Sequence, residues 1–389
     1  RWNSSGAQLY NAASSQWWSV LTDQGSGSAP VAPGTQEGQM LYWDNAALDW
    51  AANANLNISA TSLTVTTTSG ITTTGLLSAK PDAGTNTFSA GSNAGLVTQG
   101  NNATAVGYAA GQTNQGTLAV ALGSEAGITN QGSSAVAVGY NAGQTSQGNN
   151  AVSVGSQAGK TTQGIRSVAV GLSAGQTTQG TNALAMGYGA GNSLQGNSAT
   201  AVGTSAGESS QGANAVAVGD QAGESSQGVM AVAMGYNAGK GSQGDNAVAV
   251  GRQAGLTTQG VSAVAVGPYA GQTTQGGNAV AVGNLAGNTT QATSAIAVGN
   301  NTGRTNQGEY SIAMGYAAGY LDQGTRGIII NSSASVLNDT STGHIHLASS
   351  QGELKFTSAG GWEMIDGGVT NLAVSPTGTV TATAFVGDG

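Results

Sequence analysis

The sequence contains no cysteine and very little charge of either sign. Asp, Glu, Lys and Arg together make up 7% of its 389 residues, against about 25% in a typical domain. The absence of cysteine excludes disulfides and thiolate metal sites. Nine Lys and Arg stand against 17 Asp and Glu. We therefore expect no binding to nucleic acid, which requires clustered cations, and none to an anionic membrane surface.

Long apolar runs are also missing. No apolar stretch approaches the ~20 residues of a membrane-spanning helix. The start of the chain lacks the charged segment and following apolar segment of a signal peptide. The first residue is Arg1 rather than Met. We expect no membrane span, and we expect the chain to be a piece of a longer protein.

Glutamine and glycine recur at a fixed interval of 16 residues. One glycine column runs from Gly107 to Gly315 and a second from Gly95 to Gly319. No insertion breaks the period, which indicates an array of structural repeats. The glutamines occupy positions 99, 115, 131, 147, 163, 179, 195, 211, 227, 243, 259, 275, 291, 307 and 323.

Each repeat has the consensus G-x-N-A-V-A-V-G-x-x-A-G-x-T-x-Q, as in residues 132–147. The Ala-Val-Ala-Val segment alternates with a period of two, which is typical of a strand. Three or four glycines per repeat exclude a helix, since each costs about 1 kcal/mol relative to alanine. The pattern predicts an all-β fold, a parallel β-roll or β-solenoid of about 14–15 coils that spans roughly 70 Å at ~4.8 Å per coil.

Two faces of the repeated strand differ in side-chain size. Val136 and Val138 lie on one face, and the other carries mostly alanine. We expect the valines to fill the interior and the alanine face to pack against other copies of the chain in a trimer; a single-chain solenoid is the alternative. Stacking also predicts amide and hydroxyl ladders, with Gln over Gln and Thr113 over Thr129.

The repeat resembles the head repeats of YadA-like trimeric autotransporter adhesins. Matching copies are Ser-Val-Ala-Val-Gly at 167–171 and Ser-Ile-Ala-Met-Gly at 311–315, and the resemblance covers about residues 91–324. It implies a trimeric parallel β-roll, although the adhesin repeat is usually shorter. The segment Ala-Gly-Gln-Thr-Thr-Gln-Gly at 174–180 is similar to repeats in fibre proteins of large viruses and marine phages.

The flanks differ from the array in composition. We expect Trp-rich β-hairpin modules with a linker at 1–55, a β-rich lead-in at 56–90, the solenoid at 91–326 and a C-terminal β-rich fibre segment at 327–389. Leu-Tyr-Asn at 9–11 before Trp17, and Leu-Tyr-Trp-Asp at 41–44 before Trp50, resemble hairpin units of phage and viral fibres. A small aromatic core is the expected role, and a carbohydrate-binding platform is the alternative. Residues 378–389 resemble a segment of phage tail fibres.

His344 and His346 are the only histidines. Because they alternate on an expected strand, both side chains can face one side. They resemble the H-x-H metal sites of phage fibre needles. That resemblance implies a transition metal such as iron at the axis of a trimer, bound by three chains together. The alternative is two exposed histidines.

Two further site hypotheses come from the repeat columns. Glu208 and Glu224 lie one coil apart and could form a glycosidase pair, but a solvated ladder explains them more simply, and we expect no enzyme. The threonine column suggests an ice-binding face, but ice-binding faces usually carry two threonines per coil. Here one threonine is paired with glutamine, and Ser193, Ser209, Ser225 and Gly241 interrupt the column.

The sequence therefore predicts a structural fibre of a phage or virus, located on the virion surface, that acts as a rigid spacer and presents a host-attachment surface. The expected partners are further copies in a homotrimer, other virion or fibre proteins, and possible targets among host surface glycans or proteins. The alternative is a YadA-like adhesin on a bacterial cell surface. Such an adhesin carries a coiled-coil stalk and a membrane anchor.

Overall fold

A computed structural model describes residues 84–366 and 369–382, together with the backbone of six short strands in the first 83 residues. Side chains are described from residue 84 to residue 382, except those of 367–369 and 371. The chain divides into two compact units, Arg1–Gly75 and Leu76–Gly389.

The first unit contains antiparallel hairpins, as predicted. Tyr10 lies opposite Trp17, and Trp43 lies opposite Trp50. The alternative of a carbohydrate-binding platform concerns side chains that lie outside the described residues. The strands are β1 (Trp2–Asn3), β2 (Gly6–Asn11), β3 (Gln16–Ser19), β4 (Gln39–Asp44), β5 (Asp49–Ile58) and β6 (Leu63–Val65).

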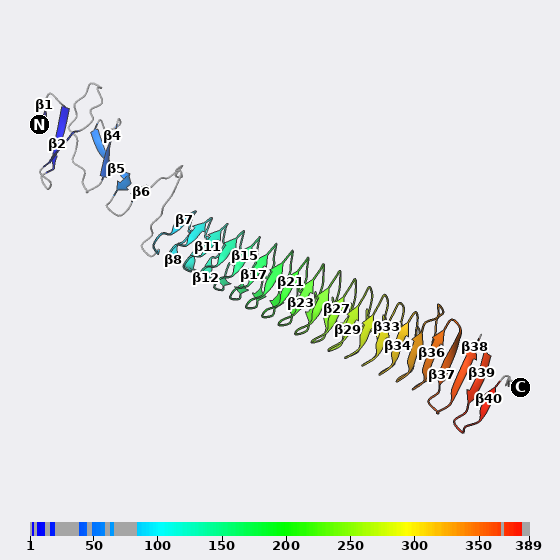
Figure 1. Ribbon diagram of the computed structural model, residues 1–389. Helices are drawn as coiled ribbons and strands as arrows, with labels where there is room; N and C mark the ends of the chain where they lie inside the picture. Colours follow the sequence, from blue (N-terminus) through cyan, green and yellow to red (C-terminus); the bar gives the residue numbers. More distant parts are fainter. Residues whose placement is uncertain are drawn as a thin grey trace. The chain divides into compact units, whose positions relative to one another are not determined.

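The second unit is a parallel β-solenoid of about 16 turns spaced about 16 residues apart, as the repeat predicted. Each turn contributes one strand to a first sheet and, over most of the stack, one to a second sheet (Figure 1). The parallel strands of the first sheet are β7 (Phe88–Ala90), β9 (Thr104–Val106), β11 (Val120–Leu122), β13 (Val136–Val138), β15 (Val152–Val154), β17 (Val168–Val170), β19 (Leu184–Met186), β21 (Thr200–Val202), β23 (Val216–Val218), β25 (Val232–Met234), β27 (Val248–Val250), β29 (Val264–Val266), β31 (Val280–Val282), β33 (Ile296–Val298), β34 (Ile312–Gly315), β35 (Ile328–Asn331) and β36 (Ile345–Ser349).

The second sheet has 13 strands. They are shorter, with two or three residues each, because the turns occupy the rest of the repeat. They are β8 (Val97–Gln99), β10 (Thr113–Gln115), β12 (Thr129–Gln131), β14 (Ser146–Gln147), β16 (Thr162–Gln163), β18 (Thr178–Gln179), β20 (Leu194–Gln195), β22 (Ser210–Gln211), β24 (Ser226–Gln227), β26 (Ser242–Gln243), β28 (Thr258–Gln259), β30 (Thr274–Gln275) and β32 (Thr290–Gln291).

The 16-residue period sets the pairing register. Val264 pairs with Val280 in the first sheet, and Gln275 pairs with Gln291 in the second. The glycine that ends each first-sheet strand is needed for its backbone conformation. Gly283 has a φ of +128°, and a Cβ at this position would lie 2.3 Å from the backbone oxygen of Gly299 in the next coil. This column therefore admits only glycine.

The interior is the reverse of the expectation. Ala265, at the middle of β29, is fully buried, as are Ala263 before the strand and Ala270 in the following turn. The valines of the same strand face outward and are only half-buried. A 16-residue coil has no room inside for larger apolar side chains. A Cβ on Gly271 would already lie 3.3 Å from the Ala265 Cβ and 2.7 Å from Gln275 Oε1.

The glutamines fill the rest of this interior and form what we call the Gln spine, the column from Gln99 to Gln323. Gln275 is 1% exposed. Its Nε2 donates to the Val264 carbonyl at 2.8 Å and to Gln291 Oε1 at 3.0 Å. The predicted amide ladder is thus confirmed, but it lies inside the coil. Thr113 lies over Thr129 as predicted. The predicted hydrogen bonding between these hydroxyls was wrong, since in the described structure no hydrogen bond joins them.

The stack ends in an antiparallel meander. β36 pairs in parallel with β35 and antiparallel with β37 (Gly352–Phe356), which is followed by β38 (Trp362–Asp366), β39 (Val369–Val374) and β40 (Val380–Ala382). β7 and β40 lie at opposite ends of the unit (Figure 1). Ile329 closes the alanine core by packing on Ala313 and Ala318, with Leu337 against them. A hairpin thus flanks the solenoid here too, with Phe356 opposite Trp362.

Candidate functional site

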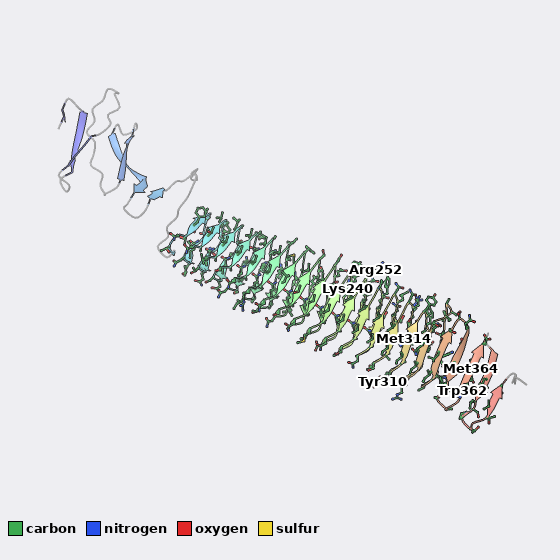
Figure 2. All side chains as sticks on the ribbon, viewed as in Figure 1. Lys240, Arg252, Tyr310, Met314, Trp362 and Met364 are labelled. Atoms are coloured by element: carbon green, nitrogen blue, oxygen red, sulfur yellow. The ribbon has the colours of Figure 1, made fainter. Side chains whose placement is uncertain are left out.

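The outward side chains of the first sheet form a continuous apolar stripe. We define this apolar stripe as the first and third residues of each first-sheet strand from β9 to β34. Its members are Val, Leu, Ile and Met, apart from Thr104 and Thr200, and none is charged. Met234 and Met314 are 43% and 41% exposed. Figure 2 shows Met314 on the stack among these outward side chains.

The stripe is larger than the apolar patches of ordinary monomers. At ~4.8 Å per strand and ~3.3 Å per residue it extends roughly 65 Å by 10 Å, about 650 Å². The largest patch on a typical monomer is about 300–600 Å². The stripe continues into the meander, where Ile330, Leu347, Leu354 and Met364 line a shallow hollow of about 620 Å³. A surface of this size and regularity is typical of an interface.

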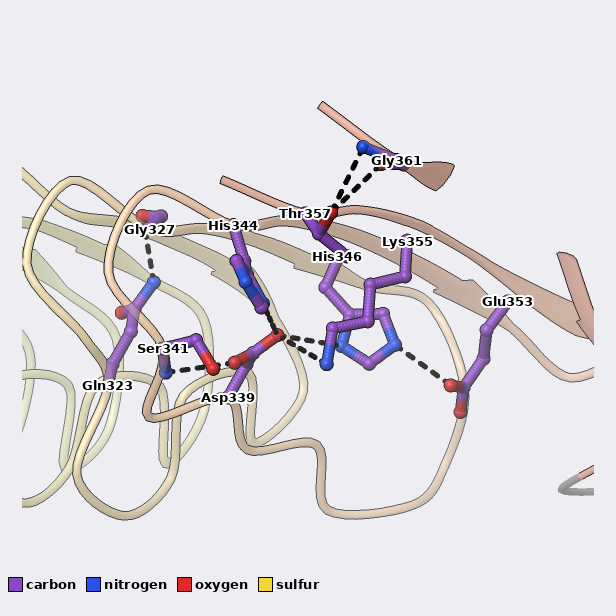
Figure 3. A network of polar contacts seen from close by, with 10 residues as sticks. All are labelled: Gln323, Gly327, Asp339, Ser341, His344, His346, Glu353, Lys355, Thr357 and Gly361. Atoms are coloured by element: carbon purple, nitrogen blue, oxygen red, sulfur yellow. Dashed lines mark hydrogen bonds and ion pairs between the residues drawn. The ribbon is translucent and has the colours of Figure 1, made fainter. Parts of the chain in front are cut away.

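The two histidines lie on the other side of the same sheet. His346 pairs with Ile329, which belongs to the interior column, whereas its neighbours Ile345 and Leu347 continue the stripe. The two rings lie on one side, as their alternation predicted, and both face the carboxylate of Asp339 (Figure 3). His344 Nδ1 lies 3.1 Å and His346 Nδ1 3.9 Å from Asp339 Oδ2.

Asp339 is buried and lies at the centre of a polar cluster. Lys355 Nζ lies 3.0 Å from Asp339 Oδ2, and the Ser341 N–H donates to Oδ1 at 3.0 Å. Burial by itself raises the pKa of Asp339, but the Ser341 N–H, the Lys355 ammonium and His344 outweigh it and hold that pKa below its ordinary value. Glu353 completes the cluster through His346 Nε2 at 2.8 Å.

The cluster does not fit a metal centre as it is arranged. The Lys355 ammonium occupies the side of Asp339 that a cation would take, and Glu353 already binds His346 Nε2. Between residues 84 and 382, no group of three or more His, Asp and Glu side chains is placed to hold a metal. Both rings also point away from the stripe. A shared iron site at a trimer axis therefore stays a prediction, which metal analysis of the purified protein would test.

Sequence reasoning missed Asp339, Lys355 and Glu353. They come together only because the loop before β36 and the strand β37 fold against the two histidines, and no spacing signals this. One member of the glutamate pair takes part in a charge ladder between coils. Glu224 binds Lys240 of the next coil at 3.2 Å, as in a ladder of surface charges.

The second sheet presents an outward face of hydroxyl groups. Because the glutamine points inward, the residue before it is the second outward position of each coil. Thr257, Thr258, Thr273 and Thr274 are all exposed, and in the described structure their hydroxyls make no hydrogen bond to protein. The two outward columns consist of the residues one and two positions before each glutamine of the Gln spine. They carry no charged residue between positions 113 and 306. The expectation that glutamine shares the outward face with threonine was therefore wrong, because the glutamines are buried. The interruptions of the threonine column from Ser193 to Gly241 remain.

Comparison of the chain with family profiles, with curated proteins and with solved structures finds no match. Within the described part of the chain, no helix is long and apolar enough to cross a lipid bilayer.

Proposed function

We propose that this chain is a structural fibre protein of a phage or virus, in which a homotrimer of β-solenoids forms a rigid spacer that presents a host-attachment surface. The observation that carries the proposal is the apolar stripe on an unbroken stack of coils. The stripe replaces the alanine face as the surface that meets other copies, because the alanines are buried inside each coil.

A second copy is the partner that the stripe fits best. A globular partner would cover part of its length, whereas another copy has a stripe of the same length and the same ~4.8 Å period. About 650 Å² of stripe per chain, with its flanking corners added, approaches the roughly 800 Å² per partner of a standard interface. Cyclic packing buries the stripe of every copy and leaves the hydroxyl faces outward.

Charge placed on the stripe tests the proposal. Val266→Glu should dissociate the trimer, because three carboxylates would be buried near one axis. Thr258→Glu, on the hydroxyl face, is the matched control and should keep the native mass measured by light scattering. Equal masses for both variants would count against the stripe as the interface.

Location is tested separately. Peptides of this chain should be found by mass spectrometry in purified viral particles. Their recovery from bacterial outer surfaces instead would favour the alternative, a trimeric adhesin of the YadA-like type.

The hydroxyl face supports a second candidate function, binding to ice. Thr257, Thr258, Thr273 and Thr274 belong to an all-threonine part of two uncharged outward columns that repeat every ~4.8 Å. The columns are interrupted elsewhere, at Leu194 and Gly241 among other positions. The threonine part is a regular array that suits an ordered lattice of water. The purified chain should inhibit ice recrystallisation, and Thr274→Tyr should abolish the effect by disrupting the array. Thr204→Tyr is the control, since tyrosine occupies the same column at Tyr188 and Tyr236. No inhibition by the unmodified chain would exclude this function.

A further inference from the structure

The apolar stripe is bounded by two corners of the coil. We call the second and third residues before each first-sheet strand the leading corner, and the second residue after it the trailing corner. Asp245 and Arg252 hold these places around β27. Figure 2 shows Arg252 and Tyr310, a leading-corner residue, at opposite margins of the stack with Met314 between them.

Three successive coils carry matching chemistry at their two corners. The first has apolar and aromatic side chains at its two corners, the second has opposite charges at its two corners, and the third has no charge at either corner. All of these residues are exposed. The pairs, in order, are Val229 and Met230 with Tyr236, Asp245 and Asn246 with Arg252, and Val261 and Ser262 with Pro268.

The two charges cannot meet within one chain. The extended segment between Ala247 and Gly251 separates the corners by about 13 Å at ~3.3 Å per residue. Asp245 accepts only the Val229 N–H, at 2.8 Å, and the Arg252 guanidinium lies over the Tyr269 ring, 5.2 Å from its centroid. Neither forms an ion pair in the described structure, so each charge is open to a partner.

Rotation about an axis parallel to the stack brings the trailing corner of one copy beside the leading corner of the next, at the same height. We propose that the copies stand parallel and in axial register, with Arg252 of each pairing with Asp245 of its neighbour. This inference rests on the proposed trimer and deepens it by assigning the register.

Other arrangements lose this match. A shift by one coil would place Arg252 against Met230 or Val261 and would desolvate an unpaired charge. In an antiparallel arrangement, each leading corner would lie beside another leading corner, and each trailing corner beside another trailing corner. Arg252 would then not meet Asp245. The corners of the coils on both sides of the charged coil carry no charge. The charged coil therefore disfavours every arrangement in which the copies are shifted by one coil.

Cysteine cross-linking tests the register directly, because the chain has no cysteine of its own. In the double variant D245C/R252C, a disulfide within one chain is excluded, since the bond needs Cα atoms within about 7 Å. Mild oxidation should therefore give a covalent species near three times 37.7 kDa on a denaturing gel without reductant. Each single variant, and the shifted pair D245C/P268C, should stay at the mass of one chain.

The possible outcomes separate this inference from the proposed function. A native trimer in which D245C/R252C fails to cross-link, or in which the shifted pair cross-links equally well, would overturn the register and leave the trimer standing. A monomeric native mass would overturn both. Exchanging the charges at positions 245 and 252 gives a second test of the register. Arg252→Asp should weaken association by roughly tenfold, and R252D/D245R should restore it.

Discussion

Replacing Gln275 with leucine should open the solenoid locally, because Gln275 belongs to the buried Gln spine. The substitution removes the donor to the Val264 carbonyl at 2.8 Å and to Gln291 Oε1 at 3.0 Å. It also removes the acceptor of Gln259 Nε2 at 3.1 Å, although that nitrogen keeps its bond to the Val248 carbonyl. A buried polar group without a partner costs about 1–3 kcal/mol. After the gain from burying a leucine, we expect a net loss of about 2–4 kcal/mol.

Hydrogen exchange measured by mass spectrometry is the assay. A loss of 2–4 kcal/mol corresponds to exchange that is roughly 30- to 1,000-fold faster in peptides that cover the coils around β30. Thr274→Leu is the matched control. It changes the adjacent outward residue, and Leu194 already occupies that column. If Q275L exchanges no faster than T274L, the Gln spine does not stabilise the coil and the reasoning is refuted.

Three further variants test other parts of the structure. Ala265→Leu should lower the melting temperature in far-UV circular dichroism, because overpacking a filled interior costs about 1–3 kcal/mol; an unchanged melt would mean that the interior has spare room. Gly283→Ala should destabilise by at least about 2 kcal/mol, since it adds backbone strain and a clash, whereas Gly277→Ala, at a position without positive φ, should melt normally. Asp339→Asn should destabilise near neutral pH. Because the pKa of Asp339 is lowered, its contribution is full above the ordinary carboxyl value of about 3.9 and is lost as the pH falls through the lower folded value. Acid titration of the unmodified protein should therefore show a loss of stability that D339N lacks, and parallel curves would contradict this role.

The period of the repeat was enough to predict the fold. An unbroken interval of 16 residues predicts both the coil and the pairing of each residue with its equivalent in the next turn. The structure adds turns at each end, where β7 on one side and β35 and β36 on the other extend the parallel sheet.

The inside of the coil was predicted wrongly for a physical reason. Alternation separates two faces of a strand without saying which one is buried, and the usual preference for larger apolar residues inside fails when the interior holds only methyl groups and glutamine. The sequence did contain a signal. The strand-centre column from Ala105 to Ala313 departs from alanine only at Ser153, whereas the outward positions vary among Val, Leu, Ile, Met and Thr.

The polar cluster around Asp339 could not be predicted from the sequence. Histidine alternation predicted that His344 and His346 share a side. Their partners Asp339 and Lys355 depend on how a loop and a meander strand close around them, which no local pattern encodes.

The mass of the unmodified protein in solution, measured by light scattering after size exclusion, tests the central claim most directly. The account predicts an elongated particle near three times 37.7 kDa, in which the apolar stripes of parallel copies are buried together. A monomer of 37.7 kDa with its stripe exposed to water would contradict it.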